Sequence, residues 1–277
     1  MDCIYLGTAA YPGLLSEIAD PPECLWIRGD RGALSDTGVA VVGARGASQE
    51  GLTAAYEIAF DLARAGVVVI SGLARGVDSA AHRGALDGGG RTIAVLGTGI
   101  DKVYPAENTE LSDRIASSGL LVTEFPPGAS PEEWHFPKRN RIISGLSRAV
   151  VIVEAMEKSG SLITARLAAD QGRDVMAVPG SIIGGRNRGA NALLKDGAKL
   201  VESAVDILQE LGLPPSPYRA SAGQAQSSEV VEFTVDDIAL QLKISAGDAL
   251  ARLLEWELTG EVQRIGSGRF IRTRGKV

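Results

Sequence analysis

The segment 136–147 concentrates the residues of this sequence that are best suited to bind an anion. It contains Lys138, Arg139 and Arg141, three cations within four residues, beside the amide of Asn140. An apolar run and a predicted buried strand follow them directly. Because the cations are joined to a hydrophobic segment, we expect a fixed anion site, and the expected anion is a phosphate backbone.

An aromatic residue stands next to these cations, at the end of a long connection. Residues 124–140 carry four prolines, and long ordered loops are often functional. Phe136 beside arginines suits base stacking together with phosphate pairing in single-stranded nucleic acid. The alternative is that Trp134 and Phe136 cover the core while the cations form a solvated face. We favour a site, because the prolines order the approach to it.

A second candidate loop follows the apolar run 39–43. Gly43 lets the chain turn, and Arg45 can pair with a phosphate through two nitrogens. A helix predicted over 48–65 offers free N–H groups at Ser48. An ordinary tight turn with a surface arginine is the alternative.

Other loops add polar residues of the kind that approach a ligand closely. Asp78 is expected to cap a helix, and Ser161 is a further candidate cap. The remaining candidate contacts are Ser71, Gly72, Ser161, Thr164 and Asn191.

These loops follow short runs that are rich in β-branched residues and apolar on both faces. Such runs are typical of parallel strands covered by helices. Alternation with helical segments predicts an α/β, doubly wound, mostly parallel sheet, with ligands beyond the carboxyl ends of its strands. The predicted strands are 39–43, 67–70, 92–96, 120–123, 150–154, 175–178 and 200–201.

We predict four segments along the chain. Residues 1–38 form a lead-in that packs on the main domain, 39–211. Residues 212–229 are rich in Pro, Ser, Ala and Gln, as linkers are. Residues 230–277 have the pattern of a winged helix: a helix starting at Thr234, a second helix and a hairpin.

Composition and missing motifs narrow the function classes. The net charge of −6 over 277 residues argues against a broadly basic surface, so nucleic-acid binding must be focused in one groove. The sequence contains no run of 18 apolar residues, so we expect no membrane span. It also lacks P-loop, G-x-G-x-x-G, C-x-x-C, H-E-x-x-H and G-x-S-x-G motifs. We therefore expect no cofactor, no metal and no catalytic residue.

Cys3 and Cys24 allow at most one disulfide, and a reduced cytoplasmic setting is the simpler interpretation.

Six motifs follow one another along the chain: Gly43-x-Arg45, Ser71-Gly72-x-Ala74-x-Gly76-x-Asp78, Phe136-Pro137-x-Arg139-Asn140-Arg141-Ile142-Ile143, Gly160-Ser161-Leu162-Ile163-Thr164-Ala165, Val178-Pro179-Gly180 and Gly189-x-Asn191. In this order they resemble the DNA-processing protein A (DprA, also called Smf) family over about residues 5–210. The C-terminal segment is similar to the small winged-helix domain that many members carry.

The resemblance implies an extended Rossmann-like fold that binds single-stranded DNA without a catalytic step. It implies protection of incoming DNA in natural transformation, loading of a RecA-type recombinase, and a homodimer, for which we predict the helix 204–211 as part of the surface. Carried over, Arg45 contacts a backbone phosphate. Lys138, Arg139 and Arg141 form a basic pocket with Phe136 near a base. Ala44 stands where the family usually has Ser or Thr, which removes one hydroxyl contact.

A nucleotide-processing enzyme of a related Rossmann-like class, similar to phosphoribohydrolases, is the alternative. Glu124, Glu154 or Asp78 would then act as acid or base, although the Pro-Gly-Gly-x-Gly-Thr loop of those enzymes is missing. For the winged helix we expect mainly protein contacts, because acidic residues accompany Arg252 on its second helix.

Overall fold

A computed structural model of the chain describes residues 2–214, 233–234, 245–258, 262–264 and 269–272. The chain divides into two compact units, Met1–Pro217 and Tyr218–Val277. Each unit is described by itself.

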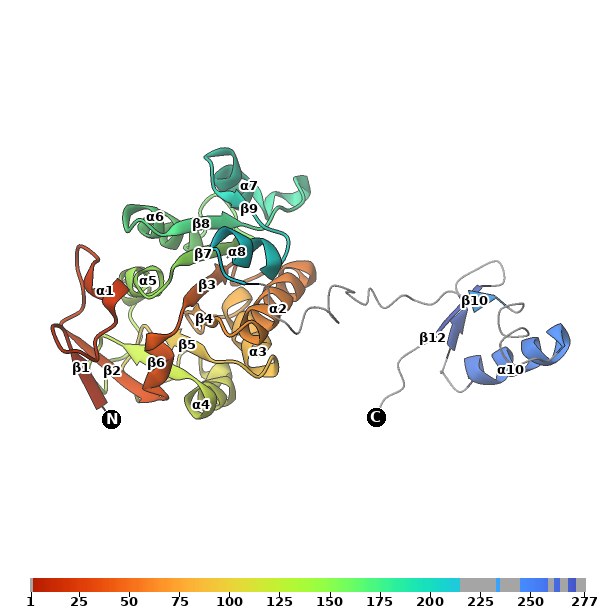
Figure 1. Cartoon of the computed structure of the whole chain (residues 1–277), viewed down its shortest axis with the longest axis horizontal. Coiled ribbons are helices and arrows are strands. Elements are labelled where there is room, and N and C mark those ends of the chain that lie inside the picture. The colour runs from red at the N-terminus through yellow and green to blue at the C-terminus, as the bar shows by residue number, and fades with distance from the viewer. Residues whose placement is uncertain (1, 215–232, 235–244, 259–261, 265–268, 273–277) are drawn as a thin grey trace. The chain divides into compact units, whose positions relative to one another are not determined.

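The first unit is built on one nine-stranded sheet, in the order β1-β2-β6-β5-β4-β3-β7-β8-β9 (Figure 1). From β6 to β9 all neighbouring strands run parallel, which confirms the predicted mostly parallel sheet. The strands are β1 Asp2–Tyr5, β2 Cys24–Gly29, β3 Gly38–Gly43, β4 Val68–Ser71, β5 Thr92–Val95, β6 Leu120–Thr123, β7 Ala149–Val153, β8 Asp174–Ala177 and β9 Lys199–Leu200.

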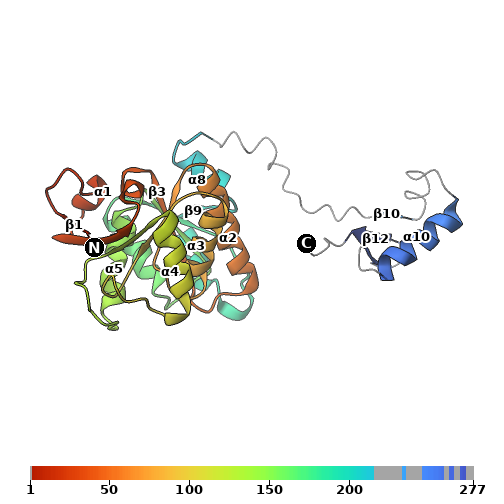
Figure 2. The ribbon, with the colours of Figure 1, turned by 90° about the horizontal axis from the view of Figure 1, so that it is seen from below.

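Helices cover both faces of this sheet because each central strand is apolar on both sides. In β3, Ala40 and Val42 join the core that contains α5, whereas Val39 and Val41 join the core that contains α2 and α8. Figure 2 shows α1 and α5 apart from α2 and α8. The helices are α1 Gly13–Ser16, α2 Gln49–Arg64, α3 Val77–Asp87, α4 Thr109–Ser118, α5 His135–Gly145, α6 Ser161–Asp170, α7 Arg188–Lys195 and α8 Ala204–Glu210, with short 3-10 turns η1 Arg31–Ser35, η2 Ala106–Asn108 and η3 Ile183–Gly185.

The lead-in contributes two strands to the sheet, β1 and β2, which the sequence interpretation missed. β2 pairs antiparallel with β6, and β1 pairs antiparallel with β2. Leu25 and Ile27 are buried between partly exposed neighbours, an alternation that was visible in the sequence. Cys3 and Cys24 form a disulfide between these strands, whereas the sequence interpretation favoured reduced cysteines.

The cations near residue 140 lie on a helix rather than on the long connection that was predicted to reach residue 140. Helix α5 begins at His135. Pro137 is tolerated in its first turn, where a backbone N–H has no partner within the helix. The helical periodicity of α5 then decides which cations share a face.

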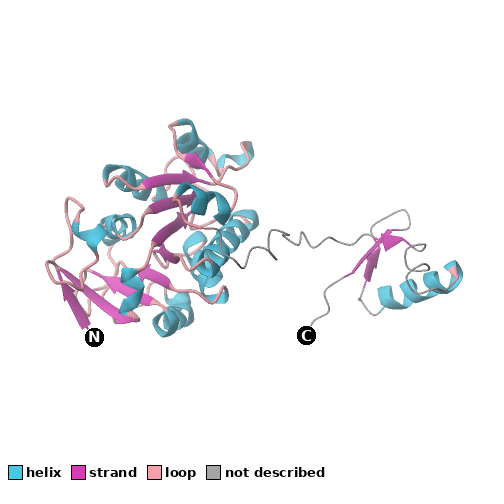
Figure 3. Ribbon diagram, viewed as in Figure 1, coloured by secondary structure: helices cyan, strands magenta, loops and turns pink. Residues whose placement is uncertain are grey.

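The second unit contains α10 Ala246–Leu258 and a small antiparallel sheet in the order β10-β12-β11 (Figure 3). β11 Val262–Arg264 pairs with β12 Arg269–Arg272, as predicted for the hairpin, and β10 Phe233–Thr234 pairs with β12. Thr234 therefore lies in a strand and not at the predicted helix start. The rest of the first predicted helix and most of the linker lie outside the described residues. None of the helices described is long and apolar enough to cross a membrane.

Candidate nucleic-acid interface

A pocket of about 640 Å³ lies where the sequence predicted a ligand, at the carboxyl ends of β3 and β7. Loops that follow β4 and β5 and the start of α6 complete its walls. The predicted contacts that line it are Gly43, Arg45, Phe136, Arg139, Asn140, Ser161 and Thr164. The structure therefore gathers seven predicted residues from three separate segments of the chain.

The loop between β3 and α2 presents Arg45 to solvent. Gly43 is needed here, because a Cβ at this position would collide with the carbonyl of Val153. The guanidinium carbon of Arg45 lies 5.5 Å from the centroid of the Phe136 ring. Arg45 is thus held at the pocket by an aromatic contact and keeps its charge available for an anion.

The start of α2 meets a carboxylate of the protein itself, where the sequence predicted a bound anion. Ser48 caps this helix, since its Oγ accepts from the N–H of Gly51 at 3.1 Å. The buried carboxylate of Glu154 accepts from the N–H of Ser48 at 3.0 Å and from its Oγ at 2.5 Å. Ser48 is absent from the pocket walls and joins the two loops that follow β3 and β7.

Arg139 forms the floor of the pocket and is only 3% exposed. Its Nη1 donates to the carbonyl of Gly72 at 2.6 Å and to that of Val95. Its Nε is buried without an acceptor. Burial lowers the pKa of Arg139 to about 10; nearby Asp78 opposes this effect, while Arg45 adds to it. The guanidinium stays charged at neutral pH and projects positive potential into the pocket.

The loop after β4 reaches the pocket wall through Ala74 and is held in place by buried polar groups. Asp78 accepts from the N–H groups of Gly72 at 3.1 Å and Ala74 at 3.4 Å, so it fixes the loop instead of capping its own helix. Burial raises the pKa of Asp78. Ser71 is fully buried and donates to the carbonyl of Val41 at 2.7 Å. Gly72 borders only a smaller space of about 50 Å³ beside Arg139.

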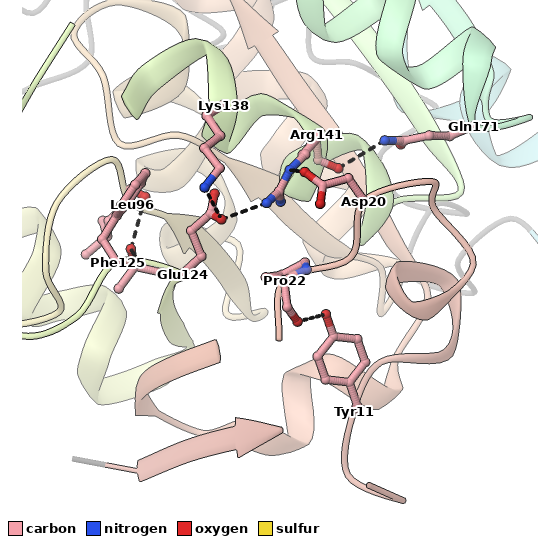
Figure 4. Close-up of polar contacts among 10 residues, drawn as sticks. Tyr11, Asp20, Pro22, Leu96, Glu124, Phe125, Lys138, Arg141 and Gln171 are labelled. Carbon is pink, nitrogen blue, oxygen red and sulfur yellow. Dashed lines mark hydrogen bonds and ion pairs between the residues drawn. The ribbon is translucent and has the colours of Figure 1, made fainter. Parts of the chain in front are cut away.

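Lys138 and Arg141 do not line the pocket, although both were predicted as contacts. Arg141 is buried and donates to Glu124 at 2.6 Å and to Asp20 at 3.0 Å (Figure 4). The Nζ of Lys138 lies 3.0 Å from the same Glu124 carboxylate. Positions three apart share one face of an α-helix, so these two cations turn together toward Glu124 and away from Arg139.

Two further predicted residues support loops. Asn191 lies on α7, where its Oδ1 accepts from the N–H of Gly180 at 3.2 Å and its Nδ2 donates to the carbonyl of Gly180 at 2.9 Å. The hydroxyl of Ser161 lies 2.7 Å from that of Ser159, and no side-chain cap starts α6. Asn191 is not on the pocket wall, whereas Ser161 is.

The pocket wall also includes residues that were not among the predicted contacts, and Tyr104, Met156 and Arg186 are three of them. Arg186 comes from the segment 184–191, whose lack of acidic residues was the available signal. Its Nη1 donates to the carbonyl of Gly46 at 3.0 Å and lies 3.6 Å from Glu154. Tyr104 and Met156 carried no sequence signal, because single exposed apolar residues are common.

Residues 2–212 match the family model of DNA recombination-mediator protein A. The chain belongs to this family. The DNA processing protein DprA of Streptococcus pneumoniae is 48% identical over 200 residues, which cover 72% of this chain and 71% of that protein. The DprA of Bacillus subtilis is 42% identical over 212 residues, covering 76% and 71% of the two chains.

Solved structures agree with this assignment. The crystal structure of DNA processing protein A from S. pneumoniae matches with a TM-score of 0.73 at 45% identity, covering 76% of this chain and 74% of that one. DNA processing protein A from Helicobacter pylori matches with a TM-score of 0.69 at 30% identity, covering 76% and 95%. The structural work on the H. pylori protein concerns its single-stranded DNA binding mode. The fold of the first unit is therefore the Rossmann-like fold of this family.

Proposed function

We propose that this recombination-mediator family member binds single-stranded DNA across the pocket, protects incoming DNA in natural transformation and helps to load a RecA-type recombinase, without a catalytic step. One observation carries the proposal: Arg45 and Arg139 reach the same pocket, and neither forms an ion pair among the described residues. Two guanidinium groups that form no ion pair, in one pocket of an acidic protein, suit a phosphate backbone, and buried Asp78 offsets only part of the charge of Arg139. The H. pylori relative supports the choice of a single strand.

The contacts that we propose are the predicted residues of the pocket wall together with Arg186. Among them, Arg45 and Arg139 supply charge, while Asn140, Ser161 and Thr164 offer polar groups. We assign Lys138 and Arg141 to the support of α5, because their charges are paired with Glu124.

The acidic residues that a nucleotide-processing enzyme would use are already engaged. Glu124 accepts from Arg141, Glu154 from Ser48, and Asp78 from two backbone N–H groups. A general base must reach the proton it abstracts, and these carboxylates instead hold loops and helices together. These contacts favour a binding protein over an enzyme.

A salt series tests the proposal. Affinity for an oligo-dT strand should fall steeply as salt rises, with a slope of log K against log salt of about −0.7 per neutralised phosphate. Arg45→Ala should weaken binding and reduce the slope, whereas Arg83→Ala, an exposed arginine outside the pocket, should change neither. The proposal is contradicted if wild type and Arg45→Ala bind oligo-dT with equal affinity, or if the affinity of the wild type does not change with salt concentration.

The proposal also covers the oligomeric state, the location in the cell and the role of the C-terminal unit. We expect a homodimer that uses α8, and a cytoplasmic location, where a RecA-type recombinase meets DNA. We also expect residues 230–277 to form a winged helix that mainly contacts protein. Sedimentation of the full chain tests the dimer. Removal of residues 212–277 should leave most single-strand affinity intact, and its complete loss would contradict this role for the C-terminal unit.

A further inference from the structure

The Phe136 ring, which was expected to stack on a base, is in contact with three protein groups. Phe136 packs against the backbone of Gly97, where an added Cβ would lie 2.8 Å from Cδ1 of the ring. The guanidinium carbon of Arg45 lies 5.5 Å from its centroid, and the Tyr104 ring lies 5.4 Å away with an interplanar angle of 38°. Three neighbours therefore fix the orientation of Phe136, which is only partly buried and lines the pocket itself.

Tyr104 is the aromatic residue that remains open at this wall of the pocket. It is 47% exposed and comes from the loop after β5. It also borders the smaller space of about 50 Å³ that Arg45 and Arg139 share. The exposed ring of Trp134 is not an alternative, because Trp134 is absent from the pocket wall and its Nε1 donates to Glu132 at 2.5 Å.

Apolar side chains are also exposed on the pocket wall beyond β7. Met156 is 57% exposed and Ile163 is 44% exposed, and both line the pocket. Strands β4 and β3 separate β5 from β7 in the sheet. At about 4.8 Å per strand spacing, the loops that carry Tyr104 and Met156 start roughly 14 Å apart. Exposed apolar side chains therefore lie on two sides of the pocket arginines, Tyr104 on one side and Met156 and Ile163 on the other. This arrangement suits a strand in which charged phosphates alternate with flat, apolar bases.

We propose that Tyr104 is a nucleobase-stacking residue of this pocket, beside the less exposed Phe136 ring that it contacts, with Met156 and Ile163 as a second apolar platform. The inference rests on the proposed function and adds the base contact to its phosphate contacts. Stacking needs an unpaired base whose face is accessible, so Tyr104 favours single strands over duplexes. Every base has an aromatic face, so the contact does not depend on sequence.

Fluorescence anisotropy of the full chain with two labelled strands of equal length tests this role. One strand is oligo-dT, and the other has abasic sites, which keep the phosphates and lack the bases. Tyr104→Ala should bind oligo-dT roughly tenfold more weakly than wild type does and the abasic strand equally well. Tyr104→Phe should restore wild-type binding. Tyr5→Ala is the matched control, because Tyr5 is 60% exposed on β1 and outside the pocket.

Each contrary outcome has a separate meaning. Unchanged oligo-dT binding by Tyr104→Ala overturns the stacking role while the proposed function stands. An equal loss on both strands also overturns it, since Tyr104 would then act only by holding Phe136 and Arg45 in place. If the wild type binds neither strand, the proposed function fails and this inference fails with it.

Discussion

The two faces of α5 use the same kind of residue for opposite purposes. On one face, Arg139 lies at the floor of the pocket without an ion-pair partner among the described residues. On the other face, Arg141 and Lys138 share the buried carboxylate of Glu124. Both arginines are at least nine-tenths buried, so exposure does not separate them. Their partners do: Arg141 forms ion pairs with Glu124 and Asp20, whereas Asp78 influences Arg139 without forming an ion pair with it and accepts from backbone N–H groups instead.

The comparison shows how a binding arginine can be told from a structural one. A charge that is balanced inside the protein contributes to the fold, because an anion gains little from approaching it. A buried charge that is not balanced is costly to the fold, so its persistence points to a ligand. Four variants sharpen or break this distinction.

Arg141→Met should produce the largest effect, a loss of about 3 kcal/mol in the free energy of unfolding, because it leaves the buried Glu124 without its main partner. Denaturant unfolding measures it. The control Arg28→Met removes an exposed pair with Asp113 and should cost at most about 1 kcal/mol. A stable Arg141→Met protein with lost DNA binding would place Arg141 among the DNA contacts.

Arg139→Met should weaken oligo-dT binding roughly tenfold, since it removes a guanidinium that a phosphate approaches. Arg141→Met is the matched control on the same helix and should retain binding under conditions where it is folded. Anisotropy titrations at fixed salt give both affinities. An equal loss of affinity in the two variants would contradict the distinction between a binding Arg139 and a structural Arg141.

Tyr11→Phe should cost about 1 kcal/mol near neutral pH, because the buried hydroxyl donates to the carbonyl of Pro22 at 2.8 Å. Burial raises the pKa of Tyr11 to about 12 from an ordinary value of 10; Arg141 opposes the rise and Glu124 adds to it. The folded state therefore prefers the protonated phenol, whose stabilising contribution is complete below pH 10 and is lost between pH 10 and 12. Unfolding curves across this range should show a shallower alkaline decline for the variant than for wild type. Parallel curves would mean that folding does not raise the pKa of Tyr11.

Lys138→Ala should have the smallest effect, about 0.5 kcal/mol in stability and no measurable change in affinity for DNA. Its ammonium is partly exposed, and Arg141 still pairs with Glu124 when it is removed. Thermal unfolding and anisotropy measure the two quantities. A clear loss of affinity would show that the face of α5 that carries Lys138 and Arg141 also contacts DNA.

The sequence predicted the bounds of the parallel core strands closely, because short, continuous β-branched runs such as 39–43 are typical of buried parallel strands. It also placed Gly43, Arg45 and Arg139 in one site, since the carboxyl ends of neighbouring parallel strands meet at one edge of a sheet. It missed β1 and β2, whose short alternating runs form an antiparallel edge. It also extended the loop before α5 into the helix, because Pro137 can end a helix or sit in its first turn.

The sequence by itself therefore determined the family, the parallel part of the sheet and most of the polar residues from which the site is made. Only the tertiary structure decided the role of each cation and each ring. Arg139 and Arg141 are two positions apart with the same chemistry, yet Glu124 meets only Arg141. Phe136 and Tyr104 are distant in the chain, yet their contact leaves Tyr104 as the more open ring. These roles depend on which groups meet in space, and local sequence does not specify that.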